Sequence, residues 1–332
     1  MNKINSHIIG MGYYVPKNII NNEYFTQFME TSDQWIQDRT GIKERRFVAN
    51  NEGPSDIAIP AVKMALENAK LTTDDIDFII FSTSTPDYYI PGSGCLIQDK
   101  MGFNTIGALD IRCQCSGFIY ALSVADQYIK AETYKNILII TSEVQSTAMD
   151  LSDKGRDTAI LFADGAAATI ISKTKNNQGI LSTHLHTQGK YAKELWVEAP
   201  SSKVKPRLTP KILEARKQFL HMNGKEVFKH AVNRFPEVIH EALNHNNLSI
   251  QDINLLIPHQ ANVRISKMVQ KKLKLKDNQV VSNIHKYGNT TSASIPIALC
   301  ETMIKKKLKK GDILILAAFG SGFSWGSAIL KW

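Results

Sequence analysis

The chain repeats itself, and this repeat limits the folds that it can adopt. The segment that begins at Leu71, LTTDDIDFIIFSTS, matches the segment that begins at Leu248, LSIQDINLLIPHQA. Both have a leucine, an aspartate, an apolar run and a small or polar exit at corresponding places. A second pair, NILIITSE and DILILAAF, sets Ile137 against Ile313. The offsets of the two pairs are 177 and 176 residues. Agreement this close indicates a duplicated architecture.

Each copy reads as strand, helix, strand. The runs FIIFS, ILIIT, LLIP and ILILA are apolar throughout, which is typical of strands that are covered on both faces in a parallel sheet. Apolar residues at the helical period predict one helix per copy, through Phe118, Leu122, Ala125 and Ile129 and through Ile297, Cys300, Ile304 and Leu308. We therefore predict an α/β protein of two packed layers, with halves 1–172 and 173–332 that join in the polar stretch KTKNNQG (173–179).

Length and composition agree with a folded protein that has a sizeable core. The chain has 332 residues, of which 43% are hydrophobic and 21% charged. No run approaches the roughly 18 apolar residues of a membrane helix. The opening MNKINSHIIGMGYYVP has no apolar stretch typical of a signal peptide. These features predict a cytoplasmic protein without membrane insertion.

The net charge of +9 points to an anionic partner. The basic residues are dispersed, and no basic motif is interleaved with aromatic residues, so nucleic acid is not favoured. A phosphorylated cofactor or an acidic carrier protein fits the charge equally well. The densest cluster, KKKLKK (305–310), is expected to end a helix, with Gly311 as its stop.

Two cysteines one residue apart stand between a predicted strand and a predicted helix, in DIRCQCSGFIYAL (110–122). A disulfide between Cys113 and Cys115 is disfavoured by this spacing and by a reducing compartment. A zinc site would need a second Cys/His pair nearby, and none is present at ligand spacing. Two buried thiols and a single nucleophile both remain possible.

Cys115 is the better candidate nucleophile because it stands where the predicted helix begins. Unpaired N–H groups at a helix start can lower the pKa of a thiol, whereas Cys113 falls within the predicted strand. An offset of 176 places Thr291 opposite Cys115, two residues after Asn289. If a pseudo-twofold axis relates the halves, the two helix starts face each other, and His259 at the exit of LLIP joins them.

Three further motifs are weak when each is taken alone. PHQAN (258–262) could hold an ordinary loop histidine, and HKYGNT (285–290) could be only a turn. The glycine-rich FGSGFSWGSA (319–328) could hold an oxyanion with its N–H groups or form a tight turn. Their joint order within a duplicated α/β chain makes the combination specific.

Taken together, these motifs resemble a known family. Four segments are similar to the signature regions of β-ketoacyl-acyl-carrier-protein synthase III, of the thiolase superfamily. They are DIRCQCSGFIYAL, IPHQANVRI, YGNTTSASIP and AAFGSGFSWGSA. TSDQWIQDRTGIKERR (31–46) and GRDTAILFADGAAA (155–168) match as well. The resemblance therefore spans nearly the whole chain, and it implies a thiolase-like fold, an α-β-α-β-α sandwich of two duplicated halves.

The resemblance also implies an activity and its residues. The activity is a decarboxylating condensation of an acyl-CoA primer with malonyl carrier protein, which starts fatty acid synthesis. Cys115 would take the acyl group, and His259 and Asn289 would bond the malonyl thioester carbonyl. Backbone N–H groups of Cys115 and Ser321 would form the oxyanion hole. No metal and no permanently bound cofactor is implied.

Binding residues are carried over in the same way. Trp35 would stack on the adenine of coenzyme A, Arg39 and Arg156 would lie near its phosphates, and Asn262 near its pantetheine arm. An ordinary hydrophobic anchor and ordinary ion pairs would explain Trp35 and the arginines equally well.

Contacts with other proteins are implied too. Lys229 and Arg264 resemble docking residues for an acidic carrier protein, although as bare charges they would read as solvated surface. Ile90 matches a residue that reaches into the acyl pocket of a partner subunit, which implies a homodimer.

Two departures from the family pattern leave the acyl donor open. GSG (320–322) stands where three glycines are common, and the basic stretch 197–228 looks long. The alternative activity is a related acyltransferase or condensing enzyme of a secondary pathway that uses a longer or branched donor. A thiol sensor or metal clip would instead require Cys113 as much as Cys115. His184 and His186 are expected to be structural.

Overall fold

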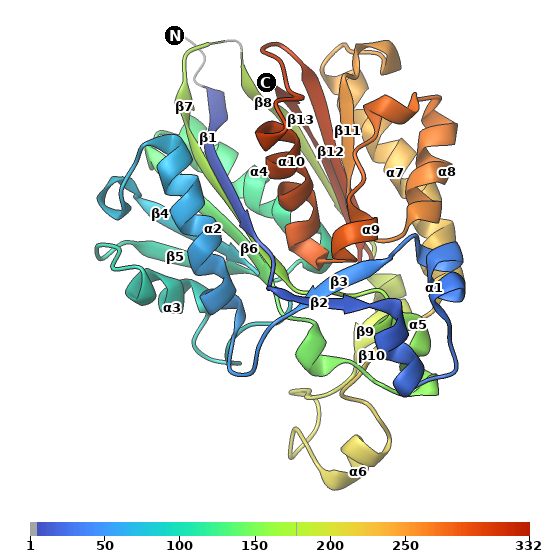
Figure 1. Cartoon of the computed structure of the whole chain (residues 1–332). Coiled ribbons are helices and arrows are strands. Elements are labelled where there is room, and N and C mark those ends of the chain that lie inside the picture. The colour runs from blue at the N-terminus through green and yellow to red at the C-terminus, as the bar shows by residue number, and fades with distance from the viewer. Residues whose placement is uncertain (1–4, 177) are drawn as a thin grey trace.

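The computed structural model describes residues 5–176 and 178–332, and Figure 1 shows two sheets with helices between them and on both outer sides. Within the described residues the first sheet has five strands in the order β1-β7-β6-β4-β5. Their bounds are β1 (Asn5–Tyr14), β4 (Phe78–Ser82), β5 (Gly107–Ile111), β6 (Asn136–Glu143) and β7 (Gly165–Thr174).

The second sheet repeats the arrangement of the first. Its four described strands follow the order β11-β12-β13-β8, and they are β8 (Gly179–Thr187), β11 (Leu255–Pro258), β12 (Ile313–Gly320) and β13 (Ser324–Lys331). The pair β4 and β6 is parallel, and the next two pairings toward β1 are antiparallel. The series β11, β12, β13, β8 has the same directions.

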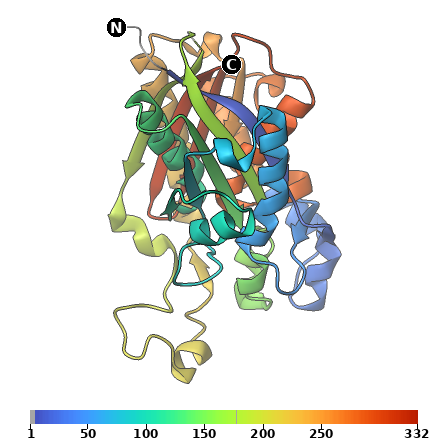
Figure 2. The same cartoon turned by 90° about the vertical axis from the view of Figure 1, so that its left-hand side faces the viewer.

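Helices form three layers around the two sheets. Between the sheets lie α4 (Gly117–Lys130) and α10 (Ser294–Ile304). The first sheet is covered outside by α2 (Pro54–Ala69) and α3 (Ser93–Lys100), as Figure 2 shows, and the second by α7 (Gly224–His245) and α8 (Val263–Leu273). The predicted α-β-α-β-α sandwich is confirmed.

Shorter elements gather at one end of the two sheets, at the bottom of Figure 1. They are β2 (Asn18–Asn21), β3 (Glu44–Phe47), β9 (Leu195–Val197), β10 (Leu220–Met222), α1 (Asp33–Thr40), α5 (Arg156–Ala159), α6 (Pro210–Glu214) and α9 (Ile284–Tyr287). The segment between β9 and β10 carries α6 and extends away from the body in both views. This projection contains most of the basic stretch that the sequence singled out.

Apolar burial explains the middle layer. Phe118, Leu122, Ala125 and Ile129 of α4 are all fully buried between the sheets, as the periodicity predicts. The prediction for the second helix was too long, since α10 ends at Ile304 and Leu308 lies beyond it. Ile304 is half exposed, and Leu308 packs against the core from the segment that follows the helix.

The lysine run also lies outside α10, contrary to expectation. The chain turns at Lys306, whose backbone is left-handed (φ 53°), and the run 305–310 follows the helix rather than completing it. Gly311 is not the helix stop but donates its N–H to the backbone oxygen of Trp332.

The sheet registers correct the repeat offset. Phe78 of β4 pairs with Ile137 of β6, and Leu255 of β11 pairs with Leu314 of β12, which gives 177 residues for both strands. The starts of α4 and α10 are also 177 apart. The residue opposite Cys115 is therefore Ser292 and not Thr291.

The strands separate cleanly along the chain. Those of the first sheet end at Thr174, and those of the second begin at Gly179. Within the predicted joining stretch 173–179, Asn177 lies outside the described residues. A division at residues 172 and 173 stays a prediction. Among residues 5–176 and 178–332, no helix has the length and apolarity to cross a membrane.

The middle layer generates a stability prediction. Leu299→Ala on α10 empties a fully buried position, so we expect the free energy of unfolding to fall by about 2–5 kcal/mol in urea titrations. Ile304→Ala on the same helix, where the side chain is 50% exposed, should change it by only about 0.5 kcal/mol. Equal losses in the two variants would contradict the placement of α10 between the sheets.

Candidate active site

The thiol of Cys115 lies at the start of α4, in the middle of the sandwich. A short 3₁₀ turn, Gln114–Ser116, leads into the helix, and Cys115 is 7% exposed. Gly320, the last residue of β12, faces it so closely that a Cβ there would lie 2.5 Å from the Cβ of Cys115. Only glycine fits this position without movement of the thiol. Cys113, expected within a strand, lies after β5, which ends at Ile111.

Burial makes the free thiol a weak acid. It raises the pKa of Cys115 to about 12, and the nearby carboxyl of Glu143 acts in the same direction. The backbone N–H groups of Cys115 and Ser321 lower this pKa but do not outweigh burial. The expected lowering by the helix start is therefore wrong for the free protein. Both N–H groups predicted for the oxyanion hole nevertheless act on the sulfur.

The imidazole of His259 is held on one side and free on the other. Its backbone N–H donates to Ala317 (2.8 Å), and its Nδ1 lies 2.7 Å from Oγ of Ser294. The side chain is 2% exposed, and Nε2 has no hydrogen-bond partner among the described residues. Burial lowers the pKa of His259 to about 3, so the ring is neutral at pH 7.

The carboxamide of Asn289 is oriented by the backbone around it. Its main chain exchanges hydrogen bonds of 2.9 Å with Leu161 and Ala163, and its Oδ1 accepts a third from the N–H of Thr291 (2.9 Å). Because Oδ1 is engaged, Nδ2 is the group left to act on a ligand.

One cavity of about 130 Å³ is lined by Cys115, His259 and Asn289 together. The rest of its lining is mainly apolar, with Leu161, Phe162, Leu195, Met222, Val227, Phe228, Ala231, Phe235, Ile265 and Phe319. A larger surface groove, of about 760 Å³, lies beside the ends of α7 and α8 and is lined by none of the predicted site residues. The structure thus joins the three predicted catalytic residues in one hydrophobic chamber.

Ser321 fits the glycine-rich loop without strain. Its hydroxyl donates to the backbone oxygen of Leu195, which lines the cavity. The positive φ of the GSG stretch falls on Gly322 (135°). A serine between the two glycines therefore still presents its backbone N–H.

Two guanidinium groups lie against the indole ring of Trp35. Arg39 and Arg156 have their Cζ atoms 4.3 and 4.6 Å from the indole centre. Asn262 joins this group to the cavity that it lines, because its Nδ2 donates to the backbone oxygen of Arg39 (2.9 Å). Its Oδ1 caps α8 by accepting from the N–H of Arg264 (2.8 Å).

The two predicted docking residues flank the same cavity. The guanidinium of Arg264 lies 5.9 Å from the ring centre of Phe228, which lines the cavity. Lys229 directly follows Phe228 on α7. Lys229 is well exposed and approaches Glu226 at 3.4 Å. Both positive charges are therefore near the chamber and close to solvent.

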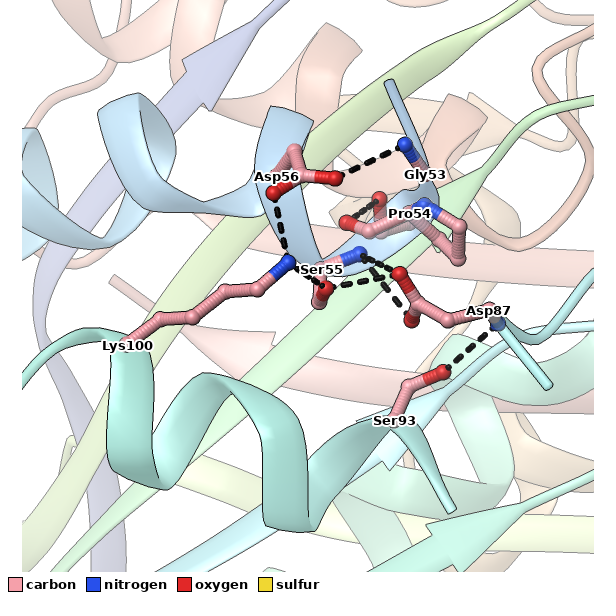
Figure 3. Close-up of polar contacts among 8 residues, drawn as sticks. Gly53, Pro54, Ser55, Asp56, Asp87, Ser93 and Lys100 are labelled. Atoms are coloured by element: carbon pink, nitrogen blue, oxygen red, sulfur yellow. Dashed lines mark hydrogen bonds and ion pairs between the residues drawn. The ribbon is translucent and has the colours of Figure 1, made fainter. Parts of the chain in front are cut away.

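Ile90 does not reach the cavity of its own chain. It is 80% exposed in the segment between β4 and α3. Figure 3 shows the base of this segment, where Asp87 accepts from the hydroxyl of Ser55 (2.7 Å) and Lys100 bonds both Ser55 (2.7 Å) and Asp56 (2.5 Å). A partly exposed polar network thus anchors the chain at Asp87, three residues before Ile90.

Sequence reasoning missed Glu143. This carboxyl is fully buried at the end of β6, and it accepts from Ser84, at both N–H (3.0 Å) and Oγ (2.6 Å), and from Oγ of Ser292 (2.6 Å). Burial raises its pKa. The available signal was an acidic residue directly after the apolar strand NILIITS.

His184 and His186 lie on β8, away from the cavity. Both contact the carboxylate of Glu241, at 3.2 and 2.6 Å. In the described part of the chain, no group of three or more His, Cys, Asp or Glu side chains could hold a metal ion.

Comparisons with known proteins agree with this architecture. Two family descriptions match: 3-oxoacyl-[acyl-carrier-protein] synthase III over residues 109–189, and its C-terminal part over residues 243–332. The β-ketoacyl-[acyl-carrier-protein] synthase III of Clostridioides difficile is 43% identical over 325 residues, which is 98% of both chains. The protein of that name from Helicobacter pylori (strain J99) is 43% identical over 319 residues, 96% of this chain and 95% of that one.

A solved structure agrees as well. The 3-oxoacyl-[acyl-carrier-protein] synthase III of Aquifex aeolicus is 38% identical and superposes with a TM-score of 0.91, over 98% of this chain and all of that one. The sequence and structure matches confirm the predicted family and fold.

The raised pKa of Cys115 predicts slow alkylation of the free protein. With a pKa of about 12, the thiolate is rare at pH 7, and iodoacetamide should modify Cys115 at a rate that rises about tenfold per pH unit up to at least pH 9. Peptide mass spectrometry follows each site, with the exposed Cys95 as an internal control. A plateau of the Cys115 rate below pH 8 would show a thiolate that burial should prevent.

Proposed function

We propose that this chain, which belongs to the 3-oxoacyl-[acyl-carrier-protein] synthase III family, condenses an acyl-CoA primer with malonyl carrier protein and so starts fatty acid synthesis. The observation that carries the proposal is the apolar cavity that Cys115, His259 and Asn289 line together. A thiol suits transfer of an acyl group between thioesters. Two neutral N–H donors suit a reaction that develops negative charge on oxygen.

The first step transfers the acyl group to sulfur. Cys115 attacks the thioester carbonyl of acyl-CoA, the carbon–sulfur bond to coenzyme A breaks, and the proton of the thiol ends on the departing coenzyme A. The N–H groups of Cys115 and Ser321, which already act on this sulfur, hold the oxyanion of the intermediate. The raised pKa implies that the proton leaves together with the attack and not beforehand.

The second step releases carbon dioxide from the malonyl group. The electrons of the broken carbon–carbon bond form an enolate, whose oxygen accepts from Nε2–H of His259 and Nδ2–H of Asn289. A neutral imidazole and a carboxamide donate hydrogen bonds without removing a proton from the substrate. The enolate carbon then attacks the carbonyl carbon of the acyl-cysteine, the carbon–sulfur bond to Cys115 breaks, and the β-ketoacyl product leaves while the thiolate takes up a proton from water.

Coenzyme A would approach along Trp35. Its adenine ring would stack on the indole in the place of one of the two guanidinium groups, and Arg39 and Arg156 would then bind phosphates. Asn262 links this group to the chamber and would lie beside the pantetheine arm. Acyl-CoA is a substrate here, and the mechanism uses no resident cofactor or metal. A free thiol nucleophile works in a reducing compartment, so we place the protein in the cytoplasm.

The working unit would be a homodimer. β5 is an exposed edge of the first sheet, and the segment between β4 and α3 carries Tyr88, Tyr89 and Ile90, all largely exposed. An unpaired strand edge beside exposed apolar side chains is typical of a protein interface. The partner's copy of Ile90 would then close the acyl end of the chamber.

Four substitutions test the chemistry. Cys115→Ala should abolish acylation, seen as the loss of the acyl mass increment after incubation with a panel of acyl-CoAs, whereas Cys113→Ala should retain it. His259→Ala and Asn289→Ala should still be acylated, but each should release carbon dioxide from malonyl carrier protein about 100- to 1,000-fold more slowly. Acylation that survives in Cys115→Ala would contradict the proposal. The panel also identifies the preferred donor.

Charge reversal tests the docking surface. Lys229→Glu and Arg264→Glu should raise the KM for malonyl carrier protein at least about tenfold and weaken its dependence on salt, because they remove positive charge from the approach of an acidic partner. Neither should change the KM for acyl-CoA. Lys63→Glu, on the exposed face of α2, is the matched control. An equal effect of the control variant would argue against a local docking site.

A further inference from the structure

A buried serine sits behind the histidine of the chamber. Oγ of Ser294, the first residue of α10, lies 2.7 Å from Nδ1 of His259 and 3.2 Å from the backbone N–H of Gln260. Ser294 is fully enclosed at 2% exposure. It does not line the cavity, so it could influence the reaction only through the ring that it touches.

The hydrogen-bond inventory fixes the direction of this contact. The N–H of Gln260 can only donate, so Oγ of Ser294 accepts from it. Among the described residues, Nδ1 of His259 is then the acceptor within reach of the serine hydroxyl. If Nδ1 carried the proton instead, Oγ would accept twice and its own hydrogen would remain unpaired in a buried place, which is unfavourable.

We propose that Ser294 is a positioning residue that holds His259 in the tautomer with its proton on Nε2. Nε2 of His259 is the ring atom that is left free toward the chamber. The effect of Ser294 on the reaction rate rests on the proposed function, in which this atom donates to the enolate oxygen. A ring with the other tautomer would present a lone pair to the enolate oxygen and would repel it. The serine thus decides whether the histidine can act as a donor.

The repeat gives independent support. At the offset of 177, Ser294 corresponds to Gly117 and His259 to Ser82. These two counterparts also face each other, because a Cβ at Gly117 would lie 2.1 Å from Oγ of Ser82. The half that carries the histidine therefore has a serine at the helix start, where the other half has Gly117, a residue with no side chain to form a hydrogen bond.

The direct test reads the tautomer in the free protein, without substrate. In ¹⁵N spectra of the histidine rings, with the His259 signals identified from their loss in His259→Ala, the wild-type protein should show a protonated Nε2 and an unprotonated Nδ1. Ser294→Ala should shift this signal toward a mixture of tautomers. A proton on Nδ1 in the wild type, or an unchanged signal in Ser294→Ala, would overturn the proposal.

Kinetics separate positioning from folding. Ser294→Ala should be acylated at Cys115 at the wild-type rate but release carbon dioxide about 10- to 100-fold more slowly, and Ser294→Thr should restore most of the rate. Thr302→Val removes another buried hydroxyl of α10, which bonds only Ala298, and it serves as the control for stability. Loss of acylation in Ser294→Ala, or failure of rescue by a folded Ser294→Thr, would refute the role. The ¹⁵N spectrum is recorded without substrate, so it tests the tautomer of His259 even if the proposed function is wrong.

Discussion

The close approach of two helix starts inside the sandwich is the constraint on which the site depends. The turn Gln114–Ser116 leads into α4 and the turn Thr291–Ala293 leads into α10, and both meet where the carboxyl ends of β6 and β12 arrive. Apolar helices packed between two sheets exclude water from this point. The same burial that organises the residues keeps the thiol and the imidazole neutral at pH 7.

The pseudo-symmetry of the fold is also broken where β6 and β12 end. The corrected offset places Glu143, at the end of β6, opposite Gly320, at the end of β12. Glu143 fills its side of the interface and accepts from Ser292, the counterpart of Cys115. Gly320 has no side chain, and the space beside Cys115 belongs to the chamber. One copy of the duplicated architecture is thus closed by a carboxyl while the other is open for a substrate.

Much of this arrangement could be predicted from the sequence because it follows from local rules. The unbroken apolar strands and the periodicity of Phe118 to Ile129 required a buried layer, and the repeat placed Cys115 and Asn289 near corresponding helix starts. The errors arose where a tertiary effect outweighs a local one. Burial reverses the expected effect of the helix start on the pKa of Cys115. The left-handed turn at Lys306 follows the end of α10, and Leu308 packs against the core from beyond the helix. Glu143 and Ser294 were not predicted, since a buried hydrogen-bond partner has no sequence pattern of its own.

The central claim is that Cys115, with its two N–H groups, and the donors His259 and Asn289 form one site. A crystal structure of the protein after reaction with acyl-CoA tests it most directly. The acyl group should be bonded to Sγ of Cys115, with its carbonyl oxygen within about 3 Å of the backbone nitrogens of Cys115 and Ser321 and its chain among the apolar residues of the chamber. An acyl group on another residue, or a carbonyl oxygen turned away from both nitrogens, would contradict the account.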